Sequence, residues 1–158
     1  MVSYRSSKSF GERYEYRAIS ELLEHGYDVY KTLIDDQGID CIIRKVVNDS
    51  PKYVVLQIKA RSETAKDPAT FSAMDIKNPR ANYAFMFYSE RLDEFWIIPS
   101  IDLVKGLAYQ NKNGKNKGKF RLDLSRKQKD KPQAKPEYDK YCGQKGFDVI
   151  EDIFMKLP

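Results

Sequence analysis

The segment that most constrains the fold is a pair of strand-like stretches, residues 39–46 and 52–60, on either side of a four-residue turn at 48–51. The turn has the sequence Asn-Asp-Ser-Pro, whose residues favour turns, whereas the β-branched residues on both sides favour strands. The pattern therefore predicts a β-hairpin. The chain is restricted to folds that contain a β-sheet, with this antiparallel pair inside it.

The other segments predict both helices and strands. Helices are expected over about residues 9–25, 100–109 and 147–157, strands over 27–33, 83–89, 94–99 and 119–124, and a short helical or irregular piece over 71–76. Gly26 is placed to end the first helix. This order predicts an α/β or α+β layer fold. Because no linker divides the chain, we expect residues 1–158 to form a single domain.

Composition excludes several classes of protein. The chain has too many aromatic residues, 13% of 158, for a disordered protein. Two cysteines cannot form a disulfide framework, and no CxxC or paired-His spacing predicts a zinc site. The longest apolar run, residues 83–88, is far shorter than the ~20 residues that span a bilayer, and the N-terminus has no apolar signal region. We therefore expect a soluble protein of a reducing compartment, the cytoplasm.

The net charge of +5 is unevenly distributed. Residues 111–135 contain ten Lys or Arg and two Asp, a net charge of +8, so the other 133 residues carry −3. This basic segment is either a solvated loop or a flexible contact for nucleic-acid phosphates. The side chains that would make such contacts are Lys112, Lys115, Lys117, Lys119, Arg121, Arg126 and Lys127.

The strand at 52–60 carries a polar pair on one face. Side chains alternate along a strand, so Gln57 and Lys59 point the same way, roughly 6.5–7 Å apart, and Ile58 points the other way. The face with this pair is either solvated or part of a site. Counting back from the hairpin turn places Asp40 opposite the same end of the strand, although Asp is also common in turns.

Glu15 lies on the apolar stripe of the first predicted helix, four residues before Ile19. A carboxylate on a buried face costs several kcal/mol unless it is paired or binds a cation. Glu15 is therefore at the edge of the stripe, or forms a salt bridge with Arg13 or Lys59, or belongs to a metal site.

Four short segments occur in an order that resembles the PD-(D/E)XK nuclease superfamily. They are Gly11-Glu12-Arg13-Tyr14-Glu15, Gly26-Tyr27, Gly38-Ile39-Asp40 and Gln57-Ile58-Lys59. The spacing is most similar to that of Holliday-junction resolvases, restriction enzymes and the homing endonucleases encoded in group I introns. The resemblance covers residues 9–61 and implies a restriction-endonuclease-like α/β core, with a mixed central sheet of about five strands flanked by helices.

The resemblance gives each candidate residue a role. Glu15 matches the helix glutamate, Asp40 the strand aspartate, Gln57 the variable ligand position and Lys59 the lysine of the motif. The first three would bind Mg²⁺, with Mn²⁺ able to substitute, and Lys59 would orient water or stabilise the transition state. Two positions depart from the motif: Ile39 replaces its proline, and Gln57 replaces an acidic ligand, which removes one negative charge.

The function that this resemblance implies is a metal-dependent endodeoxyribonuclease that leaves 5′-phosphate and 3′-hydroxyl ends on double-stranded or branched DNA. Because cutting two strands needs two active sites, a homo-oligomer, a dimer or larger, is expected. Two alternatives remain open. Gln57 and the basic segment also suit a catalytically inactive nucleic-acid-binding protein on the same fold. The third possibility is a small interaction protein in which the motif match is chance.

Overall fold

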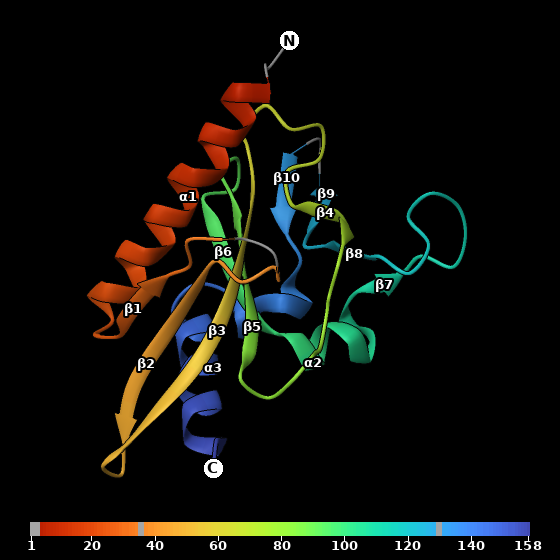
Figure 1. Cartoon of the computed structure of the whole chain (residues 1–158). Coiled ribbons are helices and arrows are strands. Elements are labelled where there is room, and N and C mark those ends of the chain that lie inside the picture. The colour runs from red at the N-terminus through yellow and green to blue at the C-terminus, as the bar shows by residue number, and fades with distance from the viewer. Residues whose placement is uncertain (1–3, 35–36, 129–130) are drawn as a thin grey trace.

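A five-stranded sheet in the order β1-β2-β3-β5-β6 forms the centre of the protein (Figure 1). The computed structural model describes residues 4–34, 37–128 and 131–158, except for the side chains of residues 4–5 and 127–128. The sheet consists of β1 (Asp28–Lys31), β2 (Cys41–Val47), β3 (Ser50–Arg61), β5 (Tyr83–Ser89) and β6 (Glu94–Pro99). Neighbouring strands are antiparallel except β3 and β5, which are parallel. The predicted α/β fold, with a mixed sheet of about five strands flanked by helices, is confirmed.

The β2–β3 hairpin closes through Asn48 and Asp49, whose φ angles are 51° and 61°. Two-residue hairpin turns of type I′ need positive φ at both positions, and Asn and Asp tolerate this conformation better than other residues with a side chain. The predicted hairpin is therefore confirmed, with a turn two residues shorter than expected. Pairing continues as far as Cys41 opposite Leu56, so β3 extends beyond the start of β2.

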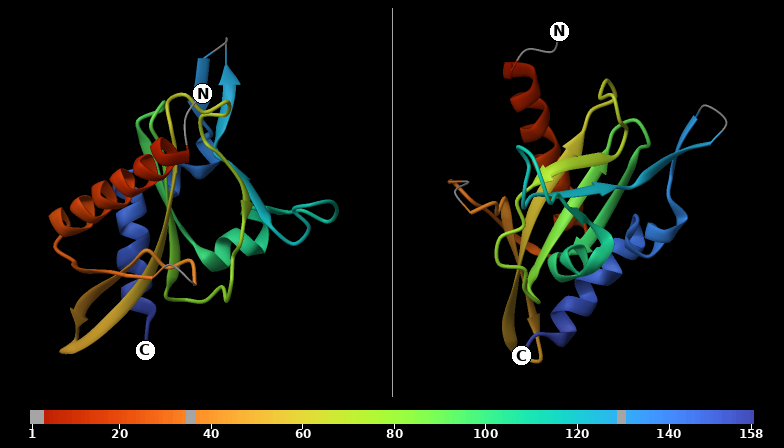
Figure 2. Two further views of the ribbon diagram at one scale, coloured as in Figure 1. Left: turned by 45° about the horizontal axis from the view of Figure 1, so that its top comes forward. Right: turned by 90° about the vertical axis from the view of Figure 1, so that its right-hand side faces the viewer.

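Two helices, α1 (Tyr4–Glu24) and α3 (Gln144–Lys156), cover one face of the sheet (Figures 1 and 2). Leu22 of α1 and Phe154 of α3 pack with strand residues such as Ile43 and Leu56, and all four are fully buried. Removing such side chains from water is the main favourable contribution to folding. We call this the helix face of the sheet.

The opposite face of β5 and β6 is covered by a smaller sheet in the order β4-β8-β7. Its strands are β4 (Thr70–Met74), β7 (Tyr109–Gln110) and β8 (Phe120–Asp123). Phe71 and Leu122 of this sheet pack with Phe87 and Trp96 in a second core. Because both faces of β5 are covered, every one of its residues is buried.

The remaining elements connect the small sheet to the C-terminus. They are α2 (Ser100–Asp102), which continues as a π-helical turn over Leu103–Leu107, the hairpin of β9 (Ser125–Gln128) and β10 (Lys131–Ala134), and a 3-10 helix over Pro136–Tyr141. No helix within the described residues is long and apolar enough to cross a membrane.

Two local expectations are wrong. Residues 71–76 were expected to be helical or irregular, but most of them belong to β4, because Phe71 and Met74 pair with β8 across a bulge. The helix expected over 100–109 ends early, because Gly106 adopts a φ of 137° and the chain then becomes extended. The β9–β10 hairpin was not expected from the sequence.

Candidate active site

Asp40 directly precedes β2 and contacts β3. Its backbone N–H donates to the carbonyl of Leu56 at 2.9 Å, and its carboxylate oxygen Oδ2 accepts a hydrogen bond from the N–H of Ile58 at 2.5 Å. The pairing of β2 with β3 ends at Cys41 opposite Leu56. The Asp40 carboxylate bonds the N–H of Ile58 just beyond this end of the pairing. The structure therefore places Asp40 beside the residue that separates Gln57 from Lys59.

Gln57 is held in place by two neighbours from distant parts of the chain. It is only 7% exposed, and its Oε1 accepts a hydrogen bond from the Tyr83 hydroxyl at 3.1 Å. The same hydroxyl lies 3.2 Å from the carbonyl oxygen of Gly38. Gly38 has a φ of +69°, and a Cβ on it would lie 3.1 Å from Nε2 of Gln57. A glycine is needed here for both its conformation and its close approach to the amide.

Gln57 and Lys59 line a cavity of about 190 Å³ on the face of the sheet opposite α1. Gln37 and Gly38 form one wall, and Ala73, Asp75 and Lys77 form another. Asp35 and Asp36, which precede Gln37 in the sequence, lie outside the described residues.

Asp75 and Lys77 were not expected from the sequence. They follow β4 in a segment that was expected to be helical or irregular. Ala73 at the β4 bulge has a φ of 58°, which is unusual for a residue with a side chain. Nothing in the local sequence indicates that this segment approaches Gln57, because the contact depends on how the two sheets pack.

Glu15 forms a salt bridge with a partner that was not expected. Its carboxylate lies 3.0 Å from Nζ of Lys31, rather than bonding Arg13 or Lys59. Lys31 also lies 4.1 Å from the centre of the Tyr16 ring. Lys31 pairs with Cys41 across β1 and β2, so the ion pair lies on the helix face of the sheet.

The charges of Asp40 and Glu15 both act on the buried thiol of Cys41. Burial first, and then the negative charges of Asp40 and Glu15, raise the pKa of Cys41 to about 12. Both carboxylates therefore lie within electrostatic range of the start of β2. The structure brings Asp40, Gln57 and Lys59 to one end of β3, whereas Glu15 approaches the same place from the helix face. Of these four residues, Gln57 and Lys59 line the cavity, and Asp40 and Glu15 do not.

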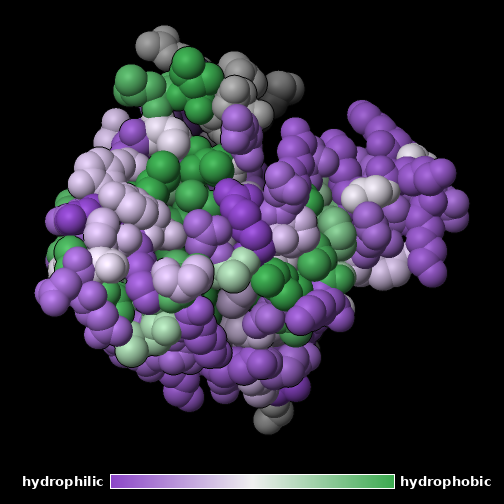
Figure 3. Space-filling view, turned by 60° about the horizontal axis from the view of Figure 1, so that its bottom comes forward, coloured by the Kyte–Doolittle hydropathy of each residue, from purple (hydrophilic) through white to green (hydrophobic). Residues whose placement is uncertain are grey.

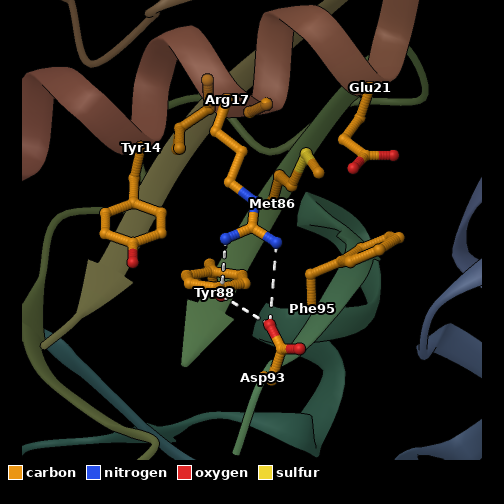
Figure 4. Close-up of a pocket in the computed structure, with 9 residues that line it drawn as sticks. Tyr14, Arg17, Glu21, Met86, Tyr88, Asp93 and Phe95 are labelled. Carbon is orange, nitrogen blue, oxygen red and sulfur yellow. Dashed lines mark hydrogen bonds and ion pairs between the residues drawn. The ribbon is translucent and has the colours of Figure 1, made fainter. Parts of the chain in front are cut away.

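A polar network fixes α1 to the sheet behind this site (Figure 4). Arg17 donates to the Tyr88 hydroxyl at 3.0 Å, and that hydroxyl donates to Asp93 at 2.8 Å. Tyr14 stacks on Tyr88 with ring centres 4.5 Å apart. These residues line a pocket of about 140 Å³ that also includes Ile58, whose N–H binds Asp40. The network therefore determines where α1 presents Glu15, which lies between Tyr14 and Arg17.

The predicted basic segment is spread over two places in the structure. Residues 111–119, which we call the finger, form the loop between β7 and β8 and carry the exposed side chains of Lys112, Lys115 and Lys117. The finger forms a hydrophilic lobe at the right of Figure 3. Lys119 and Arg121 lie at its base.

The rest of the basic segment lies away from the finger. Arg126 lines a separate groove of about 620 Å³ together with Lys66, Arg91 and Lys135. This groove lies beside the β9–β10 hairpin, which points in a different direction from the finger (Figure 2). Lys127 is in β9, but its side chain is outside the described part of the chain.

Comparisons with known proteins support the fold. The sequence matches no protein-family model and no curated protein. Among solved structures, the chain is similar to the bacterial homing endonuclease I-Ssp6803I, with a TM-score of 0.63 and 18% sequence identity. The similarity covers 96% of this chain and 97% of that one. At this identity the comparison shows a shared α/β fold along nearly the whole chain.

Proposed function

We propose that the protein is a metal-dependent endonuclease that hydrolyses phosphodiester bonds in DNA and leaves 5′-phosphate and 3′-hydroxyl ends. The observation that carries this proposal is the meeting of Asp40, Gln57 and Lys59 at one end of β3. The order of these residues resembles the PD-(D/E)XK motif. Similarity of the fold to a homing endonuclease supports the same assignment.

The available donors suit a hard divalent cation. Asp40 offers a carboxylate and Gln57 an amide oxygen, and oxygen ligands of this kind are preferred by Mg²⁺ and Mn²⁺. Within the described residues, no three His, Cys, Asp or Glu side chains are grouped as they would be around a metal ion. The amide of Gln57 is therefore an essential member of the proposed ligand set. Glu15 would complete the set if its carboxylate turned away from Lys31.

The reaction would place the phosphate beside two ammonium groups. A bound Mg²⁺ would neutralise charge on the phosphoryl group and lower the pKa of the attacking water. Lys59 would stabilise the additional negative charge of the transition state, and Lys77 in the opposite wall adds a second positive charge. Water attacks phosphorus, the bond to the 3′ oxygen breaks, and that oxygen takes up a proton.

Cutting both strands of a duplex requires two such sites. We therefore propose that the enzyme acts as a homo-oligomer, a dimer or larger. Sedimentation at micromolar concentration, with and without duplex DNA, measures this directly.

The test of the activity is cleavage of supercoiled, linear and branched DNA with Mg²⁺ or Mn²⁺, beside an EDTA control. Lys59→Ala should lower the cleavage rate by roughly 10²-fold, the usual effect of removing one group that stabilises a transition state. Lys156→Ala, in the last turn of α3, is the matched control and should cut at the wild-type rate. Failure of the wild type to cut any of these substrates contradicts the proposal, and so does a Lys59→Ala protein of full activity.

A second candidate is a catalytically inactive DNA-binding protein on the same fold. Two observations on the proposed metal ligands favour it. Glu15 is paired with Lys31, and residue 57 is a glutamine where the motif has an acidic residue. This candidate predicts salt-dependent DNA binding that survives Lys59→Ala and weakens when Lys112, Lys115 and Lys117 are all changed to Ala. Measuring cleavage and binding on the same variants separates the two functions.

A further inference from the structure

The part of the sheet formed by β1, β2 and β3 has a partly open face on the same side of β3 as the candidate site. Strand register places Tyr30, Ile42 and Val55 in one row across this face and Asp28, Arg44 and Tyr53 in the next. Side chains alternate along β3, so these two rows share a face with Gln57 and Lys59. We call them the open rows.

The open rows are covered in part: Val55 is 8% exposed and belongs to the second core, and Ile42 packs against that core. No helix of the described chain packs over these rows. The helices α1 and α3 pack on the opposite, helix face of these strands, and the small sheet covers mainly β5 and β6. Tyr30 is 53% exposed and Tyr53 is 46% exposed. Large aromatic side chains so exposed on a sheet face are typical of a surface that binds a partner.

The open rows lie at a distance from the cavity that suits DNA bound at the candidate site. Tyr53 is six positions before Lys59, which is roughly 20 Å along the strand. At ~3.4 Å per base pair, a duplex whose phosphate lies beside Lys59 would have base pairs about six steps away over Tyr53 and Arg44. Beyond Arg44 and Tyr53 the β2–β3 hairpin continues as a two-stranded ribbon, and the major groove, ~12 Å wide, accepts such a ribbon.

The charge on these rows favours contact with bases over contact with phosphates. Arg44 donates to Asp28 at 2.7 Å, so this pair is electrically neutral and attracts phosphates weakly. A guanidinium with further N–H groups can bond the O6 and N7 atoms of guanine, and a carboxylate can accept from the amino group of cytosine. The exposed lysines of the finger, by contrast, carry net positive charge without a fixed geometry.

We propose that the open rows read the base sequence next to the cleavage site, with Arg44 and Tyr53 as the principal contacts, while the finger binds phosphates. This inference rests on the proposed nuclease function. Neutral, partly aromatic rows could also contact a second copy of the chain. Their position on the same face of β3 as Gln57 and Lys59, which line the cavity, favours DNA.

The experiment compares cleavage profiles on a duplex library randomised around the cleavage position. Arg44→Ala and Tyr53→Ala should each reduce the preference by roughly tenfold or more at one or two positions about six base pairs from the cut. The triple variant Lys112→Ala, Lys115→Ala and Lys117→Ala should lower affinity for every sequence and flatten the salt dependence, without changing the profile. Tyr109→Ala removes an equally exposed tyrosine from β7 and is the matched control.

Each outcome has a defined meaning. If the wild type cuts DNA and the profiles of Arg44→Ala and Tyr53→Ala equal that of the wild type, the inference is wrong and the nuclease function stands. A flat wild-type profile also overturns the inference. Loss of a dimer in either variant, seen by sedimentation with an unchanged profile, would assign the open rows to a second copy instead. If the wild type neither cuts nor binds DNA, the proposed nuclease function is wrong, and the inference that rests on it is wrong as well.

Discussion

The Tyr83 hydroxyl donates a hydrogen bond to Oε1 of Gln57 at 3.1 Å, and both side chains are almost completely buried. On its other side the amide lies against Gly38, where a Cβ would be 3.1 Å from Nε2 and 3.3 Å from Oε1. We infer that Tyr83 is a positioning residue for Gln57, although the two come from different strands.

The first prediction concerns this hydroxyl. Tyr83→Phe should lower the cleavage rate by about tenfold and raise the Mg²⁺ concentration needed for half-maximal activity, because the amide becomes free to turn. The loss of one hydrogen bond should also lower the free energy of unfolding by about 1 kcal/mol. Tyr141→Phe is the control, because Tyr141 is equally buried and its hydroxyl bonds Asp102 away from the site at 2.8 Å. Equal metal requirements in the two variants would contradict the positioning role.

The second prediction concerns the close approach of Gly38 to the Gln57 amide. Gly38→Ala introduces a Cβ 3.1 Å from Nε2 of Gln57 at a φ of +69°. The backbone conformation should cost about 1–2 kcal/mol of stability, and the displaced amide should reduce cleavage further. Gly26→Ala has a similar φ of +84° with no atom near its Cβ, so it tests the backbone cost alone. The prediction requires similar urea midpoints for the two variants and a rate defect in Gly38→Ala only.

The third prediction concerns the ion pair between Glu15 and Lys31. If Glu15 is a metal ligand, the ammonium 3.0 Å away competes with the metal for its carboxylate. Lys31→Met should therefore lower the Mg²⁺ concentration needed for half-maximal cleavage, whereas Lys31→Arg should leave it near the wild-type value. Because the pair is partly exposed, stability should change by no more than about 1 kcal/mol. An unchanged metal requirement in Lys31→Met would remove Glu15 from the proposed ligand set.

The sequence predicts those parts of the site that depend on local spacing. Alternation along one strand relates Gln57 to Lys59, and the length of one hairpin relates Asp40 to both. These relationships need only the period of a strand and a count of residues from a turn. The structure has Asp40 beside Ile58, at the Gln57–Lys59 end that the count predicts, although the shorter turn shifts the register by two residues.

The contacts that the sequence does not predict come from elements far apart in the chain. Tyr83 reaches Gln57 because β5 lies parallel to β3, and the register of parallel strands is not set by any turn. Asp75 reaches the cavity only through the packing of the small sheet. Lys31 pairs with Glu15 because the edge strand β1 runs beneath α1, a relationship that periodicity within the helix cannot show.

The fourth prediction concerns the packing of α3. A Cβ on Gly146 would lie 2.6 Å from the carbonyl oxygen of Tyr141 and 3.2 Å from Cβ of Ile97, so part of the backbone would have to move. Gly146→Ala should lower the free energy of unfolding by about 1–3 kcal/mol. Gly11→Ala is the opposite case, because this helical glycine has open space and alanine should stabilise α1 by about 0.5–1 kcal/mol. Urea unfolding of both variants should therefore give changes of opposite sign.

The fifth prediction concerns His25, which joins α1 to α3. Its ring stacks on Phe147 at a centroid distance of 3.5 Å, and its two nitrogens lie 2.9 Å from the carbonyl oxygen of Glu21 and 3.0 Å from Oε1 of Gln144. Partial burial lowers the pKa of His25, but these two hydrogen bonds and the charges of Glu21 and Glu24 raise it more, so it lies above 6.5 in the folded protein.

A raised folded pKa makes His25 stabilise the protein in its charged form. That stability is fully present below the unfolded value of about 6.5 and is lost as the pH rises through the higher folded value. His25 is the sole histidine of the chain, so the urea midpoint of the wild type should fall between pH 6 and pH 8 more than that of His25→Gln. Only the wild type has a positive charge between α1 and α3 that is lost as the pH rises from 6 to 8. If the urea midpoints of the two proteins fell equally over this range, a group other than His25 would control the stability.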